Sequence, residues 1–294
     1  MTDHLAQSQS ILIDIAGFVV ALQADNSDVA QRIRQRYAEF LCRGEAITVR
    51  PHLTIALKSA PGALYIQPEP GPWIIESNYQ DNYLRYRSYL EQGEVDLAAG
   101  QGWLELNPTA EIENFLRVVY AWLCLHHGGL LLHAAGVVRD GYGYVFFGPS
   151  GAGKTTTSRL AAQQATVLSD DLVILRRHPT LGDYWLHGVP FRGEMTGEPR
   201  VNEQAPLKGI FRLRQDNRHY LEPLPRAAAV AELVAASPFV VRDLALSQEL
   251  MVVCHRLAQS VSLQQLHFRR DDGFWKVIDD HFRAISPAPS TNGR

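Results

Sequence analysis

The sequence predicts a mixed α/β (α+β) fold, in which a phosphate-binding core follows an additional N-terminal α+β domain. Three observations lead to this prediction. An apolar strand runs directly into a glycine-rich loop and a helix at residues 144–160. A second apolar stretch follows and leads into two aspartates, Asp170 and Asp171. Short apolar segments separated by proline and glycine turns occupy the first 105 residues, a pattern typical of strands.

The length and composition set the class of protein. The 294 residues, 46% hydrophobic and 20% charged, suffice for one or two domains with a sizeable core, which excludes a disordered or collagen-like chain. The formal net charge of −3 gives no general attraction to nucleic acid or to an anionic membrane. Three scattered cysteines disfavour a disulfide framework and a structural zinc site. Residues 1–10 lack a signal-peptide pattern, so we expect a cytoplasmic protein that binds neither nucleic acid nor membrane.

The first domain is predicted over residues 1–105. Its expected elements are a strand or hairpin at 11–22, a helix at 29–41 for which residues 26–28 offer an N-cap, and short strands at 52–57, 64–66, 73–76 and 102–106. Residues 79–89 are rich in aromatic side chains and are not assigned. Four aromatic residues of the N-terminal domain form either a surface that recognises the phosphoryl acceptor or, as the simpler interpretation, part of the core. They are Trp73, Tyr79, Tyr83 and Tyr86.

The second domain is predicted over residues 106–285, with a soft boundary between 105 and 128. A helix is expected to begin at 107–109, where Pro108 suits a first turn, and to end at Gly128-Gly129. A strand–helix–strand pattern starts at Leu130. The remaining expected elements are a strand at 205–214, helices at 227–236 and 244–259, a strand at 261–268 and a last helix to about residue 283. Residues 286–294 have the composition of a flexible tail.

Residues 148–155, GPSGAGKT, match the phosphate-binding loop GxxxxGK[ST], the Walker A pattern. The strand 145–147 precedes this P-loop and a helix begins near Lys154, a context that a chance glycine turn would lack. Loop amides and the helix N-terminus attract phosphate, Lys154 can reach the β and γ phosphates, and the Thr155 hydroxyl can bind Mg²⁺. The expected nucleotide-binding residues are Gly148, Pro149, Ser150, Gly151, Ala152, Gly153, Lys154, Thr155 and Thr156.

Asp170 and Asp171 follow the next apolar stretch, residues 165–169. A strand that delivers a carboxylate beside a phosphate-binding loop can place magnesium and orient a nucleophile. One carboxylate can hold the metal while the other accepts a proton from an attacking hydroxyl. We predict Asp170 as the base and Asp171 as the metal ligand, although the residues alone allow the exchanged roles or an ordinary Asp-Asp turn. His133, upstream of the loop, is either a structural residue or part of the same site.

These motifs together resemble the catalytic domain of HPr kinase/phosphorylase, a bacterial serine kinase whose fold is shared with phosphoenolpyruvate carboxykinase. The matching features are His133 before a small apolar strand, the loop GPSGAGKT beside the family's GxSGxGKS, and the Asp170-Asp171 pair. The match is strong over residues 130–177 and loose over about 185–225. The resemblance implies a P-loop kinase core of this type, with His133 in the site and with a homo-oligomeric assembly.

The loosely similar part adds further candidates. In the segment GVPFRGE, Arg192 could contact phosphate and Glu194 could assist magnesium, and the alternative for both is a solvated loop charge. Arg212 and Arg214 alternate on one face of the expected strand, where exposed charge is a simpler interpretation than a phosphate contact.

The chain also departs from that family. It has no arginine-rich, glycine-containing C-terminal segment of the kind that HPr kinases use to grip HPr, so HPr is not implied as the substrate. The prediction is an ATP- and Mg²⁺-dependent kinase, a phosphotransferase that acts on a serine-type hydroxyl of an unidentified protein, peptide or small molecule. Two alternatives stay open, a nucleotide-binding regulatory module and a plain NTPase. The expected catalytic residues are Asp170, Asp171, Lys154 and His133, and the expected magnesium ligands are Thr155, Asp171 and Glu194.

Overall fold

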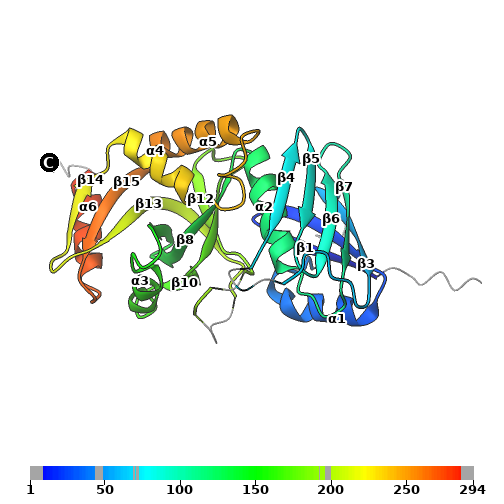
Figure 1. The fold of residues 1–294 in the computed structure, drawn as a ribbon. Helices are drawn as coiled ribbons and strands as arrows, with labels where there is room; N and C mark the ends of the chain where they lie inside the picture. The colour runs from blue at the N-terminus through cyan, green and yellow to red at the C-terminus, as the bar shows by residue number, and fades with distance from the viewer. Residues whose placement is uncertain are drawn as a thin grey trace, which may run out of the picture.

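The computed structural model describes residues 9–43, 49–68, 70, 73–191, 193–195 and 200–285. These residues form two β-sheets with the helix α2 (Glu113–His126) between them (Figure 1). The mixed α+β class predicted from the sequence is therefore confirmed. Within the described part of the chain, no helix is long and apolar enough to cross a membrane. The predicted tail, residues 286–294, and Arg192 lie outside the described residues.

The N-terminal sheet has seven strands in the order β1-β2-β3-β7-β6-β5-β4. Their bounds are β1 Gln9–Ile15, β2 Phe18–Ala24, β3 Leu53–Ser59, β4 Glu76–Gln80, β5 Tyr83–Arg87, β6 Glu91–Asp96 and β7 Gln101–Leu106. Strands β1 and β2 form a hairpin, one of the two alternatives predicted at residues 11–22. Its tight turn, Ala16-Gly17, has positive φ angles of 57° and 78°.

Helix α1 (Ser27–Arg36) packs beside this sheet. The N-cap predicted within residues 26–28 is Asn26, whose side chain accepts hydrogen bonds from the N–H groups of Asp28 and Val29 at 2.9 and 3.1 Å. The predicted end at residue 41 is wrong. The chain leaves the helical conformation at Tyr37 and continues as a single 3₁₀ turn, η1 (Ala38–Phe40), where the buried ring of Tyr37 joins the core.

Two predicted strands of the N-terminal part are wrong. Residues 64–66 and 73–75 have no strand structure, and the neighbouring strand begins only at Glu76. The Trp73 ring instead contacts the ring of Tyr89, in the turn between β5 and β6, with the two centroids 4.5 Å apart. The strand β6, with the sequence EQGEVD, was not expected because it carries a single hydrophobic side chain and so shows little apolar alternation.

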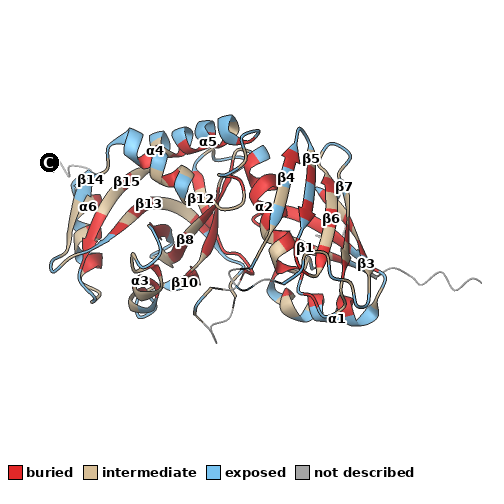
Figure 2. Ribbon diagram, in the orientation of Figure 1, coloured by how far each residue is buried: buried red, intermediate tan, exposed pale blue. Residues whose placement is uncertain are grey.

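Helix α2 is shared by both sheets, and 11 of its 14 side chains are buried (Figure 2). The rings of Tyr79 and Tyr86, from β4 and β5, pack against Trp122 and Phe115 of this helix at centroid distances of 5.5 and 5.2 Å. The core interpretation is thus confirmed for these two tyrosines, whereas Trp73 is 55% exposed. One continuous hydrophobic core includes residues of both sheets, and the division of the chain at residues 105–106 stays a prediction.

The start of α2 differs from the prediction. The helix begins at Glu113 and not at residues 107–109. The Asn107 side chain accepts hydrogen bonds from the N–H and the hydroxyl of Thr109 at 3.0 and 2.9 Å. This local turn competes with helix formation, so Pro108 belongs to the turn and not to the first helical turn.

The second sheet follows the order β10-β8-β11-β12-β13-β15-β14, and β9 pairs with both β8 and β13. The strand bounds are β8 Leu130–Arg139, β9 Tyr142–Phe147, β10 Thr166–Ser169, β11 Leu172–Arg177, β12 Tyr184–His187, β13 Gln204–Gln215, β14 Tyr220–Pro223 and β15 Ser262–Phe268. The helices are α3 Lys154–Ala161, α4 Arg226–Ala235, α5 Ser247–Ser260 and α6 Phe274–Ile285. The last three confirm the helices predicted at 227–236, 244–259 and up to 283.

The strand–helix–strand pattern predicted from Leu130 is present as β9-α3-β10, but β10 pairs antiparallel with β8 and not parallel with β9. The parallel strands are β9, β13 and β15, with β13 in the middle. Their carboxyl ends therefore lie together at one edge of the sheet, and the glycine-rich loop leaves from this edge.

Candidate functional site

The glycine-rich loop joins β9 to α3 and places Lys154 at the first position of the helix. Gly153, the residue before it, has φ of 111°, and a Cβ there would lie 2.6 Å from the ring of Phe268. A glycine is therefore required at this point for both its conformation and its size. The side chain of Lys154 returns across the loop, and its ammonium donates to the carbonyl of Gly148 at 3.2 Å.

Lys154 is only 8% exposed. Burial lowers the pKa of this lysine, while the nearby charges of Asp171 and Glu194 act in the opposite direction. The ammonium is thus poorly hydrated and already faces two carboxylates. An anionic ligand such as a phosphate would replace the missing hydration.

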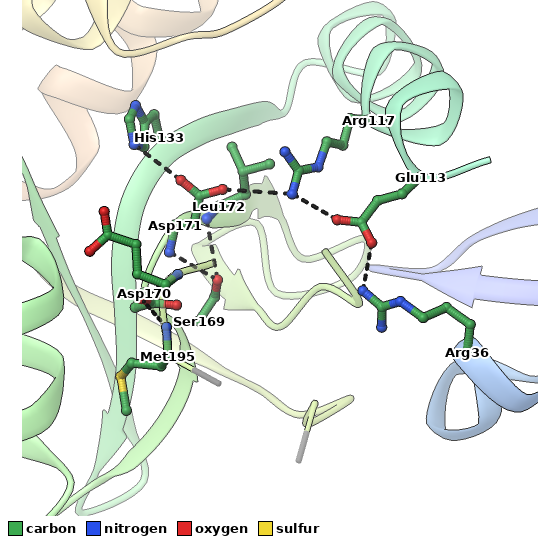
Figure 3. A network of polar contacts seen from close by, with 10 residues as sticks. Arg36, Glu113, Arg117, His133, Ser169, Asp170, Asp171, Leu172 and Met195 are labelled. Atoms are coloured by element: carbon green, nitrogen blue, oxygen red, sulfur yellow. Dashed lines mark hydrogen bonds and ion pairs between the residues drawn. The ribbon is translucent and has the colours of Figure 1, made fainter. Parts of the chain in front are cut away.

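The Asp pair connects β10 to β11. The hydroxyl oxygen of Ser169 accepts hydrogen bonds from the N–H groups of Asp171 and Leu172, both at 3.2 Å, and this turn holds the backbone of the pair. The two aspartates then point to different partners, as Figure 3 shows.

Asp170 is almost fully buried, at 3% exposure. Its Oδ2 accepts hydrogen bonds from the backbone N–H groups of Glu194 and Met195 at 3.0 and 2.9 Å. Among the described residues, none donates a hydrogen bond to the other oxygen, Oδ1. A buried carboxylate oxygen without a partner is costly, so this atom is a candidate to receive a ligand.

Asp171 is held by side chains. Its Oδ1 lies 3.1 Å from Nε2 of His133 on β8, and its Oδ2 lies 3.8 Å from Nη2 of Arg117 on α2. Arg117 was not expected from the sequence, since it sits on a helix far from the loop in the chain. It is one of the residues that join the Asp pair to the rest of the molecule.

Ten of the site residues predicted from the sequence line one cavity of about 420 Å³. In this cavity the hydroxyl of Thr155 donates to Oε2 of Glu194 at 3.1 Å. The predicted residues that line it are His133, Ser150, Gly151, Gly153, Lys154, Thr155, Thr156, Asp170, Asp171 and Glu194. Gly148, Pro149 and Ala152 form the base of the loop and are absent from the described lining.

Arg212 and Arg214, the other basic candidates, do not line this cavity in the part of the chain that the structure describes. The guanidinium of Arg212 pairs with Glu232 of α4 at 2.7 Å, and Arg214 is exposed. Their phosphate contact is therefore not supported. Exposed charge describes Arg214, whereas Arg212 is partly buried in an ion pair.

Two residues that were not predicted from the sequence, Gln215 and Arg270, also line the cavity. Gln215 ends β13, and its side chain donates to the carbonyl of Gly151 at 2.8 Å. Arg270 follows β15 and adds a second cation beside Lys154. No local motif marks either residue. Only the parallel pairing of β9, β13 and β15 brings them to the loop.

The cavity offers oxygen donors that suit Mg²⁺. Within the described residues, there is no group of three or more His, Cys, Asp or Glu side chains that could hold a metal ion. Mg²⁺ often binds through one or two carboxylates together with the phosphates of its nucleotide. Oxygen donors of this kind are present on Thr155, Asp171 and Glu194, all in the cavity. The residues therefore fit a magnesium ion that arrives with a nucleotide and not one held by protein alone.

The fold and the site define an α+β protein in which a loop of the Walker A pattern shares a cavity with an Asp pair. Residues 107–282 match the family model described as "SynChlorMet cassette protein ScmC", and the chain belongs to this family. No curated protein matches the chain. Among solved structures, the Hpr(Ser) kinase/phosphatase from Coxiella burnetii is similar with 10% sequence identity and a TM-score of 0.29, over 53% of this chain and 97% of that chain. At this level the similarity carries no argument about function.

Proposed function

We propose that this protein is an ATP- and Mg²⁺-dependent kinase that transfers the γ-phosphoryl group of ATP to a hydroxyl of a protein, peptide or small molecule. The observation that supports the proposal most is the single cavity in which Lys154 and Thr155 face Asp170 and Asp171. The motif resemblance adds to it and suggests a core of the HPr kinase/phosphoenolpyruvate carboxykinase type. The cytoplasmic location and the homo-oligomer stay predictions of the sequence.

The residues divide into two groups by their surroundings. The charges of Asp171 and Glu194 act on the Lys154 ammonium, which is expected to bind the β and γ phosphates. We therefore assign Asp171 and Glu194, with Thr155, to the magnesium ion, whose charge would offset that of the phosphates.

We assign Asp170 as the base that accepts the proton of the acceptor hydroxyl. Its Oδ1 has no hydrogen-bond partner among the described residues, while two backbone N–H groups fix its other oxygen. In the transfer, the acceptor hydroxyl gives its proton to Asp170, its oxygen bonds to the γ phosphorus, and the bond to the leaving ADP oxygen breaks. Most of the rate enhancement comes from positioning and from charge stabilisation. His133 holds Asp171 and is a site residue through that contact.

Incubation of the purified protein with radiolabelled ATP and a cell extract tests the proposal. A labelled macromolecule or metabolite supports a kinase, free phosphate alone supports a plain NTPase, and neither product supports a nucleotide-binding module. Lys154→Ala should abolish ATP turnover, since it removes the cation of the loop.

Asp170→Asn should bind ATP as the parent protein does and lose transfer by about 100-fold or more. A matched control is Asp140→Asn, because Asp140 is exposed and lies in the turn between β8 and β9, away from the cavity lining. Normal transfer by Asp170→Asn would contradict the assignment of Asp170 as the base.

A further inference from the structure

A row of polar side chains, in which charges of alternating sign follow His133, connects the candidate site to helix α1 beside the N-terminal sheet (Figure 3). It begins at His133, passes through Asp171 to Arg117 and Glu113 of α2, and ends at Arg36, the last residue of α1. Successive side chains are separated by 3.1, 3.8, 2.7 and 2.6 Å. The row therefore reaches from β8 of the second sheet, across α2, to α1 beside the N-terminal sheet.

Glu113 lies between the two arginines of this row and forms an ion pair with each. Its side chain is 10% exposed, and each carboxylate oxygen has a different arginine. Oε1 accepts from Nη2 of Arg117 at 2.7 Å, and Oε2 accepts from Nη2 of Arg36 at 2.6 Å. A carboxylate so far from water depends on its cations, and the loss of one would increase its attraction for the other.

Arg117 is shared between two carboxylates. The same nitrogen, Nη2, lies 2.7 Å from Glu113 and 3.8 Å from Asp171. The guanidinium also lies over the ring of Phe191, 5.8 Å from its centroid, which limits how far it can move. A stronger or weaker ion pair between Glu113 and Arg117 therefore changes the position of Arg117 relative to Asp171.

We propose that Arg36, Glu113 and Arg117 form a relay by which the N-terminal sheet and α1 set the position of the Asp171 carboxylate. In this relay Arg117 is a positioning residue for Asp171. Arg36 acts only through Glu113, because it neutralises the carboxylate that competes for Arg117. The effect on turnover rests on the proposed kinase function, whereas the structural link does not. The N-terminal part of the chain thereby controls the site, although none of its described residues lines the cavity.

The relay predicts effects of different size along the row. Arg117→Met should lower kcat for ATP turnover about ten-fold or more and leave the KM for ATP within about two-fold, because the loop is untouched. Arg36→Met should lower kcat by a smaller factor, since Glu113 then draws Arg117 away from Asp171. Glu113→Gln weakens that competition, so Arg36→Met should have no further effect in the Glu113→Gln background.

Hydrogen exchange provides a readout that does not depend on turnover. The amides of Asp171 and Leu172 are held by the Ser169 hydroxyl, and their exchange reports how firmly the Asp pair is placed. In the nucleotide-free protein, Arg117→Met and Arg36→Met should raise exchange in a peptide that contains residues 169–172 by about five-fold and two-fold.

Arg139→Met is the matched control. Arg139 forms a half-buried ion pair with Asp279 of α6, at 3.0 Å, remote from the cavity lining. This variant should leave both exchange at residues 169–172 and turnover unchanged. If Arg117→Met does not fold, Arg117→Lys, which keeps the charge but loses the planar fork, serves in its place.

The outcomes separate the two proposals. Parental turnover by the Arg117 variant, unchanged exchange at residues 169–172, or a full effect of Arg36→Met in the Glu113→Gln background would each overturn the relay. If the parent protein turns over no ATP but its exchange responds as stated, the kinase proposal fails and the relay stands as a structural link. If a labelled acceptor forms in the parent protein and exchange does not respond, the kinase proposal stands and the relay fails.

Discussion

Gly193 lies against the Asp pair, and the substitution Gly193→Ala tests the geometry of the site without removing any functional group. A Cβ on this residue would overlap Oδ1 of Asp170, and would lie 2.7 Å from Cγ of Asp170 and 2.9 Å from Cβ of Asp171. Non-bonded carbon atoms prefer separations near 3.5–4.0 Å. Either the Asp170 carboxylate or the segment 193–195 must therefore move.

The size of the effect follows from the contacts that this movement breaks. Asp170 Oδ2 accepts two hydrogen bonds, from the N–H groups of Glu194 and Met195. Each hydrogen bond to a charged group contributes about 1.5–3 kcal/mol, so the carboxylate loses up to about 3–6 kcal/mol of positioning free energy. A general base that leaves its place costs about 10²–10⁴-fold in rate. We expect kcat for ATP turnover to fall about 100-fold or more.

The affinity for ATP without Mg²⁺, measured by isothermal titration calorimetry, should change by less than about three-fold, because a Cβ on Gly193 meets Asp170 and Asp171 and no residue of the loop 148–155. The affinity for Mg²⁺-ATP can fall further, since Glu194, a proposed magnesium ligand that accepts from Thr155, lies in the segment that moves. Gly62→Ala is the control. A Cβ there meets nothing within 4 Å, so only the strain of its φ of +76° remains, with a cost of about 1 kcal/mol in stability. A Gly193→Ala variant with parental turnover would refute the placement of Gly193 against a catalytic carboxylate.

Two further predictions address the cavity wall and the N-terminal sheet. Arg270→Ala should raise the KM for ATP about ten-fold, since this guanidinium lines the cavity, whereas Arg269→Ala should not, because Arg269 pairs with Asp271. Equal KM values for the two variants would contradict the cavity as the nucleotide site. Burial raises the pKa of Glu91 from 4.5 to about 7. The folded chain therefore keeps a proton that the unfolded chain has lost, and the stability that this group contributes, complete below pH 4.5, decreases as the pH rises to about 7. Glu91→Gln should remove this decrease and be more stable above pH 7 by up to about 3 kcal/mol in urea unfolding; parallel pH profiles of the two proteins would show that Glu91 is not the group responsible.

The local elements of this protein follow from short-range pattern. The extended segment at 11–22, a helix cap within residues 26–28 and the helices near 227, 247 and 274 were predicted within a few residues, because each depends on side chains close together in the chain. The strand β6 was not expected, because its side chains are mostly polar and only its pairing between β5 and β7 makes it a strand. The first turn of α2 was misplaced, because a side-chain turn at Asn107 competes with the helix.

The residues of the candidate site also fall into those predicted from local sequence and those placed only by the tertiary structure. The loop at Gly148 to Thr155 and the Asp pair were predicted from the sequence alone, since phosphate binding requires a contiguous run of residues with defined spacing. The partners of these residues were decided by the tertiary structure. Arg270 reaches the loop through the parallel pairing of β13 with β15, and Arg117 reaches Asp171 because a buried helix packs between two sheets. Such contacts join residues separated by 50 or more positions in the chain, and no local spacing encodes them.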